Sequence, residues 1–280
     1  MNKPTNQNFG AISAQHVVYP NYVISLAAGT LSAGWSFFHG LEKWLGYGFA
    51  FFFATLCIYN LQRIIKLKTT IVRTNWLHWV QTKRKYLFLL SCFSGFLSLL
   101  ISTLLVDNLF NDLLVLLIGL SFSVFYVVPI KGIKLRELPY LKTPIIAIVW
   151  TSILFLLPWI NEGRNPQEIL GELIAFFFFF SAMTIPFDIR DLSIDIEMHK
   201  TIPQAFGIRG SKILALVLFT LFFIIIAIIN QEIRINVLFI VFFISFVSLV
   251  LTTNQLRSIL HFALIDSMMI ILGMYFFTLK

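Results

Sequence analysis

The chain has 280 residues, of which 58% are hydrophobic and only 12% are charged. A soluble domain of this length could not bury so much apolar surface, so the composition excludes a soluble enzyme and predicts one integral membrane domain over residues 1–280. The formal net charge of +8 would also suit a protein that binds nucleic acid. The basic residues fall mainly between apolar stretches on one side of the expected membrane, so topology explains most of them and we expect no nucleic-acid partner.

Apolar stretches of about the length of a membrane span follow one another along the whole chain. A spanning helix needs roughly 20 mostly apolar residues, and strands with open edges leave backbone groups unpaired in hydrocarbon. The sequence therefore predicts an all-α polytopic membrane protein with about nine transmembrane helices. The expected spans are residues 22–38, 44–61, 86–106, 113–130, 144–160, 173–187, 213–229, 235–250 and 259–279.

The distribution of basic residues predicts how this bundle is oriented. With the amino terminus placed inside, 17 of the 21 Lys and Arg residues fall on the cytoplasmic side. Shifting the count by one span would destroy this alternation, so nine spans and a cytoplasmic amino terminus support each other. We expect a multi-pass protein surrounded by lipid, in a bacterial inner membrane.

Three aspartates lie close together at the cytoplasmic end of the sixth expected span. Asp188, Asp191 and Asp195 have the spacing i, i+3, i+7, which places all three carboxylates on about one face of a helix. Hard oxygen ligands in this arrangement suit Mg²⁺ bridging to a phosphate. The alternative is a solvated helix end whose acids pair with Arg190 or Lys200.

Two cytoplasmic segments carry a family resemblance. The stretch from Asp188 to Gly207 resembles the second aspartate motif of the UbiA superfamily of intramembrane prenyltransferases. Asp191 and Asp195 match its paired aspartates, and Lys200-Thr201-Ile202-Pro203 match its basic and turn residues. After the fourth expected span, the segment from Tyr126 to Arg136 is similar to the family's Y-x-x-P sequence with trailing basic residues.

The first acidic motif of that family is degenerate here. At the end of the second expected span Asn60 matches the motif, but Leu61, Ile64 and Lys68 stand at its aspartate positions. In one interpretation, Arg63 binds diphosphate oxygens in place of one metal ion, because it lies on nearly the same face as Asn60. In the other, the motif is absent because the protein no longer ionises a diphosphate.

The resemblance implies helices around a central cavity and transfer of a prenyl group from an allylic diphosphate to an aromatic or lipid acceptor. It implies catalysis by Asp191 and Asp195, with Asp188, Asp191 and Asp195 holding Mg²⁺ at the cytoplasmic cap. The rival hypothesis is a non-catalytic carrier of isoprenoid lipids on the same fold. The residues expected to bind the prenyl diphosphate are Asn60, Arg63, Lys66, Lys68, Tyr126, Lys131, Lys134, Arg136 and Lys200.

One further acid lies inside the last expected span. An ionised Asp266 in hydrocarbon would cost several kcal/mol unless it is paired or faces water. Intramembrane acids often serve function, but a hydrogen bond between packed helices would also account for this one.

Overall fold

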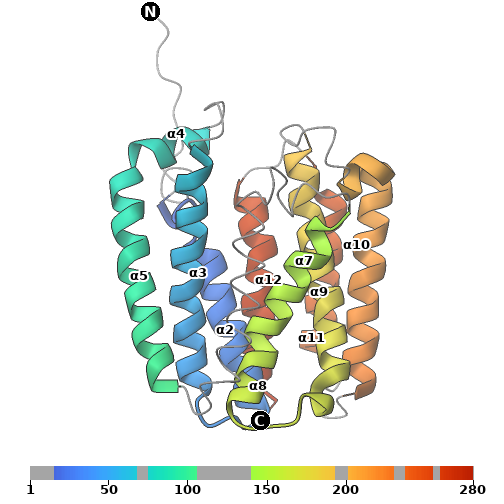
Figure 1. Ribbon diagram of the computed structural model, residues 1–280. Coiled ribbons are helices and arrows are strands. Elements are labelled where there is room, and N and C mark those ends of the chain that lie inside the picture. The colour runs from blue at the N-terminus through green and yellow to red at the C-terminus, as the bar shows by residue number, and fades with distance from the viewer. Residues whose placement is uncertain are drawn as a thin grey trace, which may run out of the picture.

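The computed structural model describes residues 16–67, 75–105, 140–192, 201–229, 237–254 and 259–279. Within these ranges all regular structure is helical (Figure 1). The elements are α2 (Tyr22–Phe38), α3 (Trp44–Leu67), α4 (Asn75–Thr82), α5 (Arg84–Leu105), α7 (Lys142–Thr151), a π-helical segment (Ser152–Leu156), α8 (Leu157–Asn161), a 3₁₀ turn (Pro166–Ile169), α9 (Leu170–Asp191), α10 (Ile202–Ile229), α11 (Val237–Thr252) and α12 (Ile259–Phe277).

The helices confirm the prediction of a polytopic all-α membrane protein. Six helical segments are long and apolar enough to cross a bilayer, when α7, the π-helical segment and α8 are counted as one continuous segment (Lys142–Asn161). Helices α2 and α11 are shorter apolar helices. Eight of the nine expected spans thus correspond to described helices, and the remaining one, 113–130, lies outside the described residues. The short helix α4 was not predicted, because its 8 residues are too few to register as a span.

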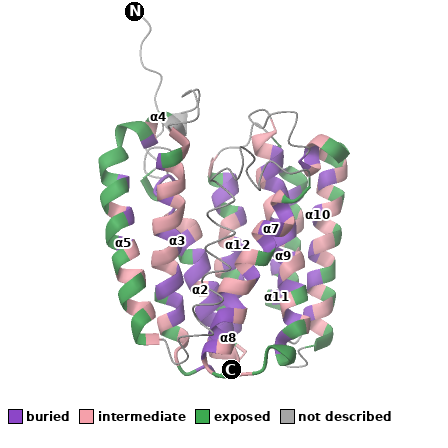
Figure 2. Ribbon diagram, in the orientation of Figure 1, coloured by how far each residue is buried: buried purple, intermediate pink, exposed green. Residues whose placement is uncertain are grey.

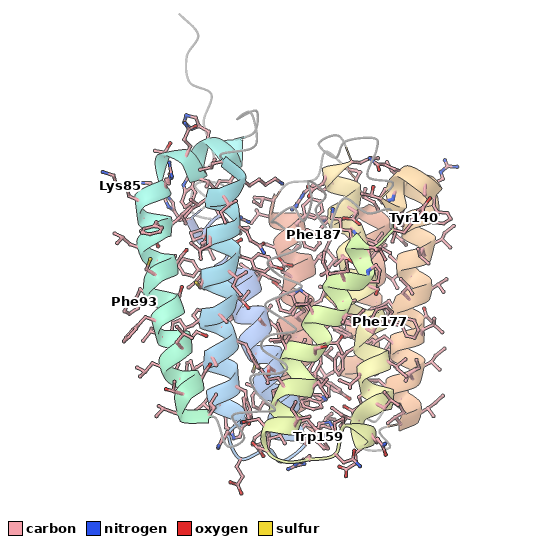
Figure 3. The ribbon with its side chains drawn as sticks, in the orientation of Figure 1. Lys85, Phe93, Tyr140, Trp159, Phe177 and Phe187 are labelled. Carbon is pink, nitrogen blue, oxygen red and sulfur yellow. The ribbon has the colours of Figure 1, made fainter. Side chains whose placement is uncertain are left out.

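The outer surface is suited to lipid rather than to water. Helix α5 exposes Phe88, Leu89, Phe93 and Leu104, each more than half accessible, and much of this helix has the colour of exposed residues in Figure 2. Phe93 points away from the bundle (Figure 3). A continuous apolar face of this kind would make a soluble protein aggregate, whereas in a bilayer it is the surface in contact with acyl chains. The chain is an integral membrane protein.

Helix α2 lies in the interior and packs against both α3 and α12. The α2–α12 contact depends on two glycines: a Cβ atom on Gly34 would lie 2.0 Å from the carbonyl oxygen of Gly273. On the other side of α2, a Cβ atom on Gly29 would lie 2.7 Å from the carbonyl oxygen of Gly48. Small residues allow helix backbones to approach closely in lipid, which brings three helices together around the interior.

The direction of each helix decides which residues meet. Helices α3 and α9 end, and α2, α7 and α12 begin, at the upper end of the bundle in Figure 1. The lower end holds α8 and the 3₁₀ turn before α9. The late residues of α3 and α9 are therefore close to the early residues of α7 and α12.

Candidate functional site

A cavity of about 390 Å³ lies among α2, α3, α7, α9 and α12, a size typical of small-molecule sites. Its lining changes along the helices. Phe51, Trp150, Phe180 and Met269 line the deeper part, whereas the charged lining residues lie toward the upper end. These charged residues are Arg63, Lys142, Asp188, Arg190, Asp191 and Asp266.

Asp188 is held by the first turn of α7. Its Oδ1 lies 2.6 Å from Nζ of Lys142, and Oγ1 of Thr143 donates a hydrogen bond of 3.3 Å to its Oδ2. The Asp188 side chain is only 3% exposed, so the pair joins α7 to α9 in a water-poor environment. Sequence reasoning counted Lys142 only as a topology signal; its position at the start of a span, two residues before Pro144, was the signal that could have identified it.

Asp191 pairs with its neighbour Arg190, as the alternative interpretation of this helix end expected. Nε of Arg190 donates to Oδ1 of Asp191 at 2.7 Å and Nη2 donates to Oδ2 at 3.2 Å. The guanidinium also packs over the rings of Phe187 and Phe262, at 5.2 and 4.9 Å from their centroids. Phe187 lies near the upper end of the bundle (Figure 3). These contacts fix the Arg190 charge at the cavity wall.

Arg63 reaches the same cavity from α3. It donates a hydrogen bond to the backbone carbonyl of Tyr19, in the segment that leads into α2. Burial raises the pKa of the Tyr19 phenol, and the nearby Arg63 charge opposes that increase. Arg63 and Asp191 line the same cavity.

Asn60 lies behind the cavity wall rather than on it. It is fully buried, and its Oδ1 accepts a 2.9 Å hydrogen bond from Nδ2 of Asn21. Its own Nδ2 donates to the carbonyl oxygens of Pro20 and Leu56, both at 2.9 Å. Asn21 adopts a left-handed conformation at φ 66°, which asparagine tolerates well. Asn60 thus fixes the start of α2 against α3.

The other predicted site residues are less informative. Lys66 is half-buried and does not line the cavity, although its charge acts on Asp191. The remaining candidates lie outside the described residues, so their placement stays a prediction. They are Lys68, Tyr126, Lys131, Lys134, Arg136, Asp195 and Lys200.

No protein-family model matches the chain, and no curated protein shows significant sequence similarity to it. Its structure is similar to that of a UbiA homologue from Archaeoglobus fulgidus bound to GPP and Mg²⁺, with a TM-score of 0.59, 14% identity, and coverage of 93% of this chain and 99% of that one. The same homologue bound to DMAPP and Mg²⁺ gives a TM-score of 0.56 at 14% identity, with the same coverage. The chain has the fold of a UbiA homologue.

The UbiA-like fold raises the question of whether the residues present suit a divalent metal. In the described part of the chain, no three His, Cys, Asp or Glu side chains are grouped closely enough to hold one. Both oxygens of Asp188 are occupied by Lys142 and Thr143. Both oxygens of Asp191 are likewise bonded to Arg190. Asp191 is the more accessible ligand, because its side chain is 24% exposed at the cavity wall and that of Asp188 is 3% exposed. A site on Asp191 fits Mg²⁺ chemically if further oxygen ligands come from outside the described residues.

Proposed function

We propose that the chain is a membrane prenyltransferase that moves a prenyl group from an allylic prenyl diphosphate to an aromatic or lipid acceptor. One observation carries this proposal: a single cavity has three cations and three aspartates at one end and an apolar, aromatic interior at the other. A prenyl diphosphate has the same division, with a polyanionic head on a hydrocarbon tail.

The deeper part of the cavity suits the tail and the reactive carbon. The rings of Trp150 and Phe180 are stacked with centroids 5.6 Å apart, and Tyr59 lies 6.2 Å from Trp150. Aromatic faces attract cations, so they would stabilise the allylic carbocation formed when the C–O bond to diphosphate breaks. A site that excludes water would also keep this cation from being hydrolysed.

The upper end suits the leaving group. Arg63, Lys142 and Arg190 bring three cations to the cavity wall, where they would stabilise the negative charge that develops on the departing diphosphate. Arg63 would stand in for part of the absent first acidic motif, because a guanidinium binds phosphate oxygens bidentately. The acceptor then bonds to the freed carbon, and an acceptor that carries a proton at the attacking atom releases it.

Mg²⁺ held by Asp191 and Asp195, with Asp188 nearby, would add charge neutralisation at the diphosphate. Lys66, Lys68, Lys131, Lys134, Arg136 and Lys200 are proposed to contribute further positive charge at the cap, and Tyr126 and Asn60 to shape it. We place this cap on the cytoplasmic side of a bacterial inner membrane.

A non-catalytic carrier of isoprenoid lipids is the second candidate. It is favoured by the internal pairing of Asp188 with Lys142 and of Asp191 with Arg190, because a paired carboxylate is less available to a metal. A carrier would bind the diphosphate without releasing pyrophosphate.

The test uses purified protein in lipid nanodiscs, with dimethylallyl or geranyl diphosphate, a bacterial lipid extract as the source of acceptor, and Mg²⁺ present or absent. We expect Mg²⁺-stimulated release of pyrophosphate, and its loss in the Asp191→Asn variant. Lys85→Ala is a matched control, because Lys85 is an exposed lysine at the upper end that does not line the cavity (Figure 3). Binding without release would favour the carrier, and absence of both would exclude both functions.

A further inference from the structure

Helix α12 contributes one charged side chain to the cavity. The cavity is lined by Ile259, Phe262, Ala263, Asp266 and Met269. These positions are i, i+3, i+4, i+7 and i+10, so one face of α12 forms this part of the wall. Phe262 packs against Arg190 toward the upper end, and Met269 lies deeper. Asp266 therefore lies at the boundary between the charged end and the apolar interior.

Asp266 differs from the other two aspartates of the cavity. Asp188 and Asp191 each have a cation within 3 Å, from Lys142 and Arg190 respectively. Asp266 forms no ion pair with any residue in the described part of the chain. It nevertheless lines the same cavity as Arg190 and Arg63, and it lies one helical turn beyond Phe262, whose ring packs against the Arg190 guanidinium.

Two arginines line the same cavity as Asp266. Arg63 comes from α3 and Arg190 from α9. In a water-poor cavity, like charges from separate helices are costly unless a counter-charge lies near them. The described lining residues include three cations and three aspartates. Lys142 pairs with Asp188 and Arg190 pairs with Asp191, and Asp266 is the third acid of the same wall.

We propose that Asp266 is the resident counter-ion of the diphosphate site. It balances Arg63 and Arg190 when the site holds no anion, and it repels a bound diphosphate, which favours release of the pyrophosphate product. Asp266 is thus a positioning residue that sets anion affinity through the two arginines. This inference rests on the proposed function, because it presupposes a diphosphate at the upper end of the cavity.

The experiment measures binding of inorganic pyrophosphate, without Mg²⁺, to protein in lipid nanodiscs by calorimetry. Asp266→Asn removes the charge while nearly keeping the shape, and we expect it to bind pyrophosphate about tenfold more tightly than the wild type does. Asp266→Glu keeps the charge and should stay within about twofold of the wild type. Ser267→Ala is the neighbouring control, because Ser267 does not line the cavity and bonds only to its own helix.

An increase in affinity separates this role from a structural one, because a disturbed fold would lose affinity rather than gain it. Equal or weaker binding by Asp266→Asn, with clear binding by the wild type, would overturn the counter-ion role and leave the proposed function standing. Failure of every variant to bind pyrophosphate, both without Mg²⁺ and with Mg²⁺ added, would overturn both. Should Asp266→Asn not fold, Asp266→Ser removes the same charge and is expected to give the same increase.

Discussion

The two ends of the bundle both contain buried charged side chains, but they use them differently. At the lower end, Glu172 is 4% exposed and its Oε2 accepts hydrogen bonds from Nε1 of Trp35 at 2.7 Å and Nε2 of His39 at 3.0 Å. At the upper end, Asp191 and Arg63 have partners and also line a cavity of about 390 Å³. One set of charges joins helices, whereas the other also faces a space that a ligand can enter.

Two partly buried charged residues make further contacts between loops and helices at the lower end. Glu162 accepts hydrogen bonds from the backbone N–H groups of Glu42 and Lys43 at 3.0 and 3.1 Å. Arg164 lies 4.8 Å from the ring centroid of Trp159, which lies at that end (Figure 3), and it donates to the carbonyl of His39. A buried charge therefore indicates function only when it also borders open space. We expect upper-end substitutions to change activity and lower-end substitutions to change stability.

The largest effect is expected at the upper end. Asp191→Asn should lower the rate of pyrophosphate release about a thousandfold, because it removes a charged group that faces the leaving diphosphate and the proposed metal. Thermal unfolding in detergent should show a stability close to that of the wild type. Initial rates with geranyl diphosphate provide the measurement, and a rate near that of the wild type would contradict the catalytic assignment.

At the lower end we expect a substitution to lower stability and to leave activity nearly unchanged. Glu172→Ala leaves the indole N–H of Trp35 without its acceptor in a buried site, so we expect a loss of about 3 kcal/mol in the free energy of unfolding. Pyrophosphate release per folded molecule should stay within about twofold of the wild-type rate. A large fall in specific activity at full stability would show that the two ends are not separate in function.

Arg63→Ala tests whether a fixed cation serves in place of the first acidic motif. We expect the rate of pyrophosphate release to fall about 10- to 100-fold, and Arg63→Lys should restore it only in part, because a lysine cannot bind two phosphate oxygens with a planar fork. The matched control is Arg164→Ala at the lower end, which also removes an arginine bonded to backbone carbonyls. Unchanged turnover in Arg63→Ala would instead favour the interpretation that the motif has lost its function.

The sequence predicted the spans well because hydropathy is a local property. The span expected at 22–38 coincides with α2, and 44–61 is extended to Leu67 in α3 because amphipathic turns continue the helix beyond the apolar run. Side-chain partners were less predictable, because they depend on which helices pack together. The pair between Lys142 and Asp188 required knowing that α7 and α9 are neighbours. Asn60 was expected to bind the substrate. Its hydrogen bonds to Asn21 and Pro20 form because the start of α2 packs against α3, which the sequence did not indicate.

Asn60 gives the smallest and most discriminating test, since a match to a family motif and a buried structural role predict different outcomes. Asn60→Ala removes the partner of the Asn21 amide and of the Pro20 carbonyl, so we expect a loss of about 2 kcal/mol in the free energy of unfolding. Because Asn60 does not line the cavity, KM for geranyl diphosphate should change less than about threefold in the folded fraction. Loss of a direct hydrogen bond to the charged diphosphate would change KM by more than this. The stability loss and KM are measured on the same nanodisc preparation, with Arg63→Ala as the reference for a cavity residue. A rise in KM comparable to that of Arg63→Ala, with stability unchanged, would show that Asn60 binds the substrate and does not serve mainly to hold α2 against α3.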